Sequence, residues 1–140
     1  MKQLMVLSFA FLMLFSVFSS DAQVKKPDAK AVVSKKIEVY YFHFSRRCNT
    51  CKSVEANAQK AVETLYADKV KKGEYSFKSI NLDEASSKAI AKKLGVGGQT
   101  LLVVCGKKQI DITDKGFMNA QDPEKMKEEI KLAVNQAIKG

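Results

Sequence analysis

The chain has 140 residues and carries 24 lysines and arginines against 15 aspartates and glutamates, which gives a formal net charge of +9 at neutral pH. Such a charge favours anionic partners. The lysines, however, are scattered along predicted helices and tails with no aromatic residues between them, which argues against a nucleic-acid-binding face. The length fits one domain with a single hydrophobic core.

The first 22 residues have the pattern of a secretory signal peptide. Lys2 gives a positive start, residues 4–18 form an apolar run broken only by two serines, and residues 20–22 place small side chains where a signal peptidase reads. The apolar run is shorter than the roughly 20 residues that span a bilayer, which favours cleavage after Ala22 over an uncleaved anchor. We therefore expect the mature chain to be exported, periplasmic or extracellular, with no stable membrane span.

Export also sets the redox context of the three cysteines. Cysteines tend to pair in an oxidising compartment, and an odd number leaves one over. Cys48 and Cys51 are separated by two residues, and Cys105 stands alone.

The mature chain opens on residues 23–36, QVKKPDAKAVVSKK, which lack periodicity and are predicted to form a flexible lysine-rich linker. Residues 37–44, IEVYYFHF, are rich in β-branched and aromatic side chains and are predicted to form a strand. Both faces of this strand are apolar, which is typical of a central strand covered by helices on each side. One face carries Ile37, Val39 and Tyr41, and the other carries Tyr40, Phe42 and Phe44.

Residues 49–72 are predicted to form one helix that stops at Gly73. Its apolar side chains recur at spacings of three and four, and charged side chains lie opposite them. The apolar set is Val54, Ala58, Ala61, Val62, Leu65 and Tyr66.

The second half of the chain alternates strands and helices. Residues 75–82 are predicted to form a strand, followed by a short helix that Asp83 caps and Gly95 ends. Residues 100–105 are predicted to form a buried strand, and residues 109–113 its hairpin partner. A last helix is predicted to begin at Asp122-Pro123, with an apolar face of Met126, Ile130, Ala133, Val134, Ala137 and Ile138.

This order of elements predicts an α/β domain over residues 37–140, with a central mixed four-stranded sheet flanked by helices. The first strand–helix–strand unit requires a right-handed crossover and hence parallel strands. The hairpin adds an antiparallel pair.

Cys48 and Cys51 lie where the first strand gives way to the first helix. The helix N-terminus stabilises an anion, which favours the thiolate of Cys48. Arg46 and Arg47 add positive charge directly before it; they could orient an anionic substrate or be solvated loop residues. Cys51 is nearly one turn later, within reach of a mixed disulfide formed at Cys48. We therefore expect Cys48 to be the exposed nucleophile and Cys51 the more buried resolving thiol.

Three alternatives to redox exchange can be weighed. A structural disulfide would close a very short loop and so constrain little of the unfolded chain. A zinc site wants four ligands, yet His43 is the only histidine, and Cys105 lies five residues from the start of its strand, roughly 16 Å along it. Cys105 is better explained as a small buried apolar residue. A two-sulfur site for a soft ion such as Cu(I) or trivalent arsenic stays open.

His43, five residues before Cys48, has two interpretations. It could tune the thiolate or shuttle a proton, or it could be a polar residue at the strand end, hydrogen-bonded to the backbone. The second interpretation is favoured, and His43 is kept as a secondary site residue.

The element order with C-x-x-C after the first strand resembles the thioredoxin fold, and the resemblance covers nearly the whole mature domain. Smaller features agree with it: Lys52 after the second cysteine, Leu94-Gly95-Val96 at a helix exit, Thr100-Leu101-Leu102 at the start of the third strand, and Gly116 after the hairpin. The resemblance implies that the backbone of Thr100 faces the sulfur atoms.

The chain departs from thioredoxins at three positions. Arg47 replaces the tryptophan before the first cysteine, and Phe42 replaces a buried acid six residues before it. Gly97-Gly98-Gln99 replaces the loop that ends in a cis-proline facing the disulfide. The last departure weakens the case for a general protein reductase and leaves room for metal or metalloid capture, so Gln99 is added to the secondary site residues.

A narrower resemblance rests on residues 40–55, which fit the string YYFHxxxRCxTCxxxE. This string is similar to a family of small exported thioredoxin-like proteins known as nitrophenyl-compound nitroreductase subunits of the arsenic-operon type. The resemblance implies that the protein carries out a redox reaction together with a partner. No G-x-G-x-x-G follows a strand, and nothing in the sequence indicates a flavin or nicotinamide site.

The sequence thus favours an exported thiol–disulfide oxidoreductase that needs no bound cofactor and no metal. Its partner would be a redox protein or a small thiol-reactive substrate, not nucleic acid. Two other functions stay open: a binding module that holds a soft metal or metalloid, and a subunit of a nitroreductase-type redox complex.

Overall fold

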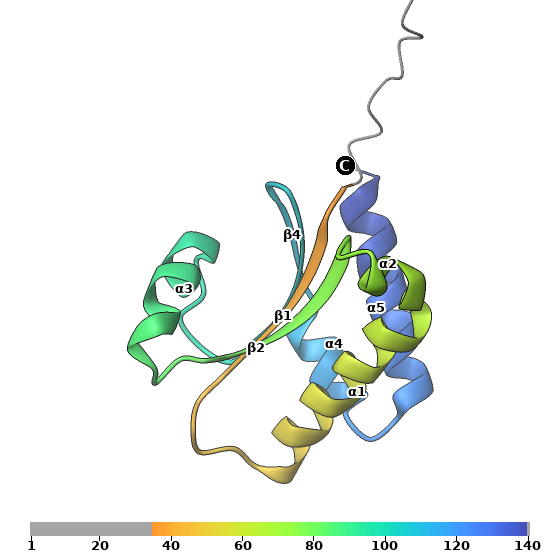
Figure 1. The fold of residues 1–140 in the computed structure, drawn as a ribbon. Coiled ribbons are helices and arrows are strands. Elements are labelled where there is room, and N and C mark those ends of the chain that lie inside the picture. Colours follow the sequence, from red (N-terminus) through yellow and green to blue (C-terminus); the bar gives the residue numbers. More distant parts are fainter. Residues whose placement is uncertain (1–34, 140) are drawn as a thin grey trace, which may run out of the picture. The chain divides into compact units, whose positions relative to one another are not determined.

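A computed structural model describes residues 35–139 of the chain. The predicted signal peptide, residues 1–22, and most of the predicted linker, residues 23–36, lie outside the described residues. The rest is an α/β fold with helices on both faces of a mixed four-stranded sheet, in a thioredoxin-like arrangement (Figure 1). The fold class predicted from the element order is therefore confirmed.

The sheet is built around β1 (Ile37–His43), which lies in its interior in the order β2-β1-β3-β4. Strand β2 (Tyr75–Asn81) pairs with β1 in parallel. On the other side β3 (Thr100–Cys105) pairs with β1 antiparallel, and β4 (Lys108–Asp111) pairs antiparallel with β3. The parallel first unit and the antiparallel hairpin are both as predicted.

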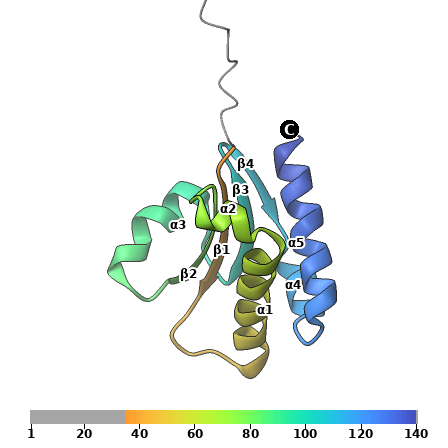
Figure 2. The same cartoon turned by 45° about the vertical axis from the view of Figure 1, so that its right-hand side comes forward.

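The two faces of β1 pack into two separate apolar clusters. Ile37, Val39 and Tyr41 lie in the larger one, under helices α1 (Asn49–Leu65) and α5 (Pro123–Ile138). Tyr40 and Phe42 lie in the smaller one with α3 (Lys88–Leu94). Figure 2 shows α3 on one side of the sheet and α1 and α5 on the other. The alternation predicted for this strand is confirmed up to Phe42. Phe44 was expected in the core, but β1 has already ended there and its side chain is 42% exposed.

The single helix predicted over residues 49–72 is instead two helices, α1 and α2 (Ala67–Lys71). Tyr66 separates them with a non-helical backbone, φ −130° and ψ 34°. Its ring packs against Tyr75 of β2 at 4.9 Å between centroids. This contact with the core ends the helix at Tyr66. The apolar periodicity of the sequence continues past this residue and therefore predicted one longer helix. Gly73 follows α2 with a positive φ of 71°, as its predicted role as a stop requires.

The predicted cap at Asp83 is wrong. A 3₁₀ turn, η1 (Ala85–Ser87), precedes α3, and the Asp83 carboxylate accepts a hydrogen bond from the backbone N–H of Ser45 instead. The predicted stop at Gly95 is confirmed, because this residue has a left-handed φ of 68° at the end of α3.

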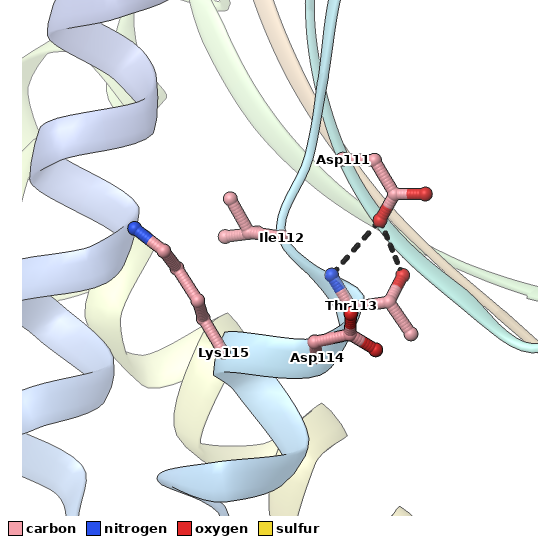
Figure 3. A pocket seen from close by; sticks show the side chains of 5 residues that line it. All are labelled: Asp111, Ile112, Thr113, Asp114 and Lys115. Atoms are coloured by element: carbon pink, nitrogen blue, oxygen red, sulfur yellow. Dashed lines mark hydrogen bonds between the residues drawn. The ribbon is translucent and has the colours of Figure 1, made fainter.

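The hairpin strand ends earlier than predicted, at Asp111, and Thr113 begins an additional helix, α4 (Thr113–Met118). The Asp111 carboxylate accepts hydrogen bonds from both the N–H and the hydroxyl of Thr113, which fixes this turn (Figure 3). Gly116 lies in α4, where an added Cβ would come within 2.8 Å of the Leu101 side chain. The close packing of α4 on β3 therefore needs a glycine here.

Helix α5 begins at Pro123, as predicted, and Asp122 caps it by accepting a hydrogen bond from the N–H of Lys125. Its predicted apolar face is buried against the sheet, with Ile138 partly exposed at its end.

Candidate active site

Cys48 and Cys51 lie at disulfide distance, with their Cα atoms 5.2 Å apart. Strand β1 ends at His43, a four-residue loop follows, and Cys48 then occupies the N-cap position of α1 with extended backbone angles. Its sulfur accepts a hydrogen bond from the N–H of Cys51 at 3.2 Å. Cys48 is exposed and Cys51 is only 7% exposed, as the sequence suggested, while their chemical roles stay a prediction.

The N-terminus of α1 favours negative charge on Cys48. The residues of its first turn, Asn-Thr-Cys-Lys, include no acidic side chain. The unpaired N–H groups and the dipole of a 17-residue helix therefore act on the sulfur without a competing carboxylate. This environment favours a thiolate once the disulfide is opened.

The two arginines before Cys48 are in different environments. Arg47 forms an ion pair with Glu55, one turn after Cys51 on α1. Arg46 is exposed and makes no ion pair with any residue of the described part of the chain. The positive charge beside Cys48 is therefore smaller than the sequence predicted, because the Glu55 carboxylate balances the charge of Arg47.

His43 is buried and hydrogen-bonded on both ring nitrogens. Nδ1 lies 3.0 Å from the carbonyl oxygen of Phe44, and Nε2 lies 2.9 Å from the hydroxyl of Ser79 on β2. The contact with a backbone carbonyl is the one favoured by the sequence. The contact with Ser79 was not foreseen, and Ser79 in turn donates to Glu55.

Tyr41 connects the cysteines to the loop before β3. Its fully buried hydroxyl donates to the carbonyl oxygen of Cys51 at 3.1 Å and accepts from the Gln99 side chain at 2.8 Å. Burial raises the pKa of Tyr41, so its hydroxyl stays protonated. The sequence placed Gln99 near the site by resemblance but treated Tyr41 as an ordinary core residue, because its hydroxyl partners are distant in sequence.

Thr100 lies at the start of β3, where it pairs with Phe42 of β1. Its hydroxyl donates to the carbonyl oxygen of Gly98 at 3.0 Å, which shapes the loop that carries Gln99. All peptide bonds of the described residues are trans, those of this loop included.

The loop between β1 and α1 is anchored to the end of β2. The N–H of Ser45 donates to Asp83 at 2.7 Å, and the Asn81 side chain donates to the hydroxyl of Ser45 at 3.0 Å. The backbone hydrogen bond from Ser45 holds the pKa of Asp83 below its ordinary value, with a smaller effect from the charge of His43. The exposed Phe44 is carried on this same loop.

We expect the Asp83→Asn variant to show how this anchor depends on pH. Because the folded-state pKa of Asp83 is lowered, its carboxylate stabilises the fold above the unfolded-state pKa, and this contribution is lost as the pH falls through the folded-state pKa. Denaturant unfolding from neutral to acidic pH should show a gap in unfolding free energy between wild type and variant that closes in acid. A gap of constant size across this range would contradict the anchor.

Cys105 is buried at the far end of β3, opposite Ile37 at the start of β1, whereas Cys48 follows the end of β1. The expectation of a buried apolar role is confirmed, since Cys105 packs in the larger cluster. Within residues 35–139, no three His, Cys, Asp or Glu side chains come together as a metal site would need.

A surface pocket lies at the turn between β4 and α4 (Figure 3). Its lining consists of Asp111, Ile112, Thr113, Asp114 and Lys115, and it includes neither cysteine. Asp111 is already engaged by Thr113, and Lys115 reaches Glu129 on α5 at 3.0 Å. These groups serve the local fold.

Comparison with known proteins gives this chain no family: no family model matches it, and no curated protein matches it. None of the helices in the described part is long and apolar enough to cross a membrane.

Proposed function

We propose that the protein is a thiol–disulfide oxidoreductase in which Cys48 is the nucleophile and Cys51 the resolving thiol. The observation that carries this proposal is the pairing of an exposed cysteine at a helix N-cap with a buried cysteine three residues later. A partner can reach only the exposed sulfur of Cys48. The buried sulfur of Cys51 is then placed to displace the partner from a mixed disulfide at Cys48.

The exchange needs no further cofactor. A partner thiolate attacks the sulfur of Cys48, a mixed disulfide forms, and the bond to Cys51 breaks with its electron pair on the Cys51 sulfur. A second partner thiol then attacks the mixed disulfide, so that the partner leaves oxidised and both cysteines are reduced. The same steps in reverse reduce a partner disulfide.

The surroundings favour a reactive disulfide over a structural one. The loop it closes contains only two residues between the cysteines, so it restricts the unfolded chain very little. The helix N-terminus and the exposed Arg46 both stabilise a thiolate on Cys48. Arg46 and Phe44 are both exposed on the loop that precedes Cys48.

We further propose, from the sequence, that the chain is exported and acts on a redox protein or a small thiol-reactive substrate. The likeness of residues 40–55 to the nitroreductase-subunit family supports work beside a redox partner. Gly97-Gly98-Gln99 replaces the cis-proline loop of thioredoxins. We therefore propose that the protein acts on a dedicated partner and not on a broad range of proteins.

A turnover assay tests the proposed function. The protein at catalytic concentration should accelerate electron transfer from glutathione to a peptide disulfide. The Cys48→Ala variant should lose the acceleration entirely, and the Cys105→Ala variant, which removes the buried third cysteine, should keep it. If wild type gives no acceleration but binds Cu(I) or arsenite stoichiometrically, the binding-module alternative replaces the proposal.

A further inference from the structure

The segment that carries the exposed cysteine has more positive than negative charge. Between residues 44 and 59 the basic side chains are Arg46, Arg47 and Lys52, and Glu55 is the only acidic one. The ion pair between Arg47 and Glu55 neutralises one of the three cations. The segment therefore keeps two cations, Arg46 and Lys52, that no acidic residue of its own compensates.

The position of Arg46 is set by its two neighbours in the loop. The N–H of Ser45 donates to Asp83 at 2.7 Å, and Arg47 is held by its ion pair. Arg46, between them, is exposed and makes no ion pair with any described residue. Two peptide units separate it from Cys48, so their Cα atoms lie within about 7 Å of each other.

Lys52 lies on the other side of the exposed cysteine. Its backbone N–H donates to the carbonyl oxygen of Cys48 at 3.2 Å, which places the two residues on one helix face, one turn apart. Its side chain is exposed. The Debye length at physiological ionic strength is about 8 Å, so salt screens the charges of Lys52 and Arg46 only in part at the sulfur. Asp83 offsets some of this charge, and the helix N-terminus adds to it.

The charge around Cys48 affects which substrates react with it. The attacking group is a thiolate, which by itself repels an anionic substrate and attracts a cationic one. The two uncompensated cations offset this repulsion for an anion and oppose the approach of a cation. Arg47 contributes little to this effect, because the Glu55 carboxylate is bound to it.

We propose that the substrate is a disulfide with negative charge beside its sulfur atoms and that Arg46 is the main residue that selects it. The inference rests on the proposed thiol–disulfide exchange and adds the chemical class of the substrate to it. Lys52 supports the same selection from the helix. The carboxylates of the substrate face these cations while its sulfur meets Cys48.

The exchange with such a substrate balances as follows. The Cys48 thiolate of the reduced protein attacks one substrate sulfur, a mixed disulfide forms, and the other half of the substrate leaves as a thiolate. Cys51 then attacks the Cys48 sulfur, the second half leaves as a thiolate, and the protein disulfide forms again. Two electrons pass from the protein to the substrate, and the released thiolates take up through water the protons that the two cysteines lost.

Rapid mixing of the reduced protein with three small disulfides tests the selection. Glutathione disulfide is a net anion, cystamine is a cation, and hydroxyethyl disulfide is neutral. The measured quantity is the ratio of the rate constants for glutathione disulfide and cystamine, compared between wild type and each variant. The same sulfur of Cys48 attacks both substrates, so a change in the reactivity of this thiolate alone leaves the ratio unchanged.

Two substitutions should move this ratio in opposite directions. Arg46→Gln removes an uncompensated cation and should lower the ratio by about fivefold at low ionic strength. Glu55→Gln leaves the charge of Arg47 uncompensated and should raise the ratio by a similar factor. Both effects should shrink as salt is added, because the charges lie near the surface.

Lys107→Gln is the matched control, because it makes the same change in net charge far from the site. Lys107 is exposed in the turn between β3 and β4. It follows Cys105, which pairs with Ile37 at the start of β1, whereas Cys48 follows the end of that strand. The length of β1, roughly 20 Å, separates the two regions, so the ratio in this variant should equal that of wild type.

The outcomes separate the substrate class from the proposed function. If Arg46→Gln and Lys107→Gln give the same ratio, or if Glu55→Gln lowers it, the selection by charge is wrong, and a normal rate with hydroxyethyl disulfide leaves the oxidoreductase in place. If the reduced wild type reacts with none of the three disulfides, the proposed function is wrong, and the substrate class with it.

Discussion

Replacing Cys51 by serine is expected to trap the partner on Cys48 as a stable mixed disulfide. In wild type Cys51 attacks from within the same helical turn, so the reaction is intramolecular and far faster than attack by a free thiol. Without it, release of the partner depends on external thiols and should slow by about a hundredfold or more. Non-reducing gels and mass spectrometry of the variant, mixed with its oxidised partner or glutathione disulfide, measure the trapped species.

The reciprocal variant provides the control. Cys48→Ser leaves only the buried Cys51 and Cys105, which a partner does not reach, and so should give no trapped species. Equal trapping by the two single variants would contradict the assignment of roles, and stronger trapping by Cys48→Ser would reverse it.

Leu101→Ala should lower the free energy of unfolding by about 3 kcal/mol, within the range found for buried leucines. Leu101 on β3 is fully buried, and it packs so closely under α4 that a Cβ on Gly116 would lie 2.8 Å from it. Its removal leaves a cavity that the surrounding sheet and helices only partly fill. Denaturant unfolding, with the disulfide kept oxidised, measures the loss.

Leu132→Ala makes the same chemical change on the outer face of α5, where the side chain is 59% exposed. It should change the unfolding free energy by less than about 0.5 kcal/mol. A similar loss in both variants would mean that the larger cluster does not hold β3 in place beside the active-site loop.

The periodicity of the sequence was enough to predict the sheet and the helices that cover it. Strand β1 alternates two sets of large apolar residues, and each set is buried in its own cluster. The C-x-x-C spacing at the end of this strand then placed an exposed and a buried cysteine correctly, because a helix N-cap is exposed and its third residue faces the sheet.

Local patterns could not predict features that depend on distant residues. Tyr66 ends α1 because of its contact with Tyr75, and α4 begins where the Leu101 N–H donates to the Thr113 hydroxyl. Ser79 gave no signal at all, since its partners come from β1 and α1. Glu55 ends the string over residues 40–55, but its ion pair with Arg47 depends on the path of the loop.

The reduction potential of the Cys48–Cys51 pair tests the central claim most directly. Thiol trapping and mass spectrometry across a series of glutathione redox ratios measure it in the purified protein. A potential between about −270 and −120 mV, the range of known exchange proteins, is the predicted result. A value well below about −300 mV would identify a disulfide that stays closed and would contradict the account.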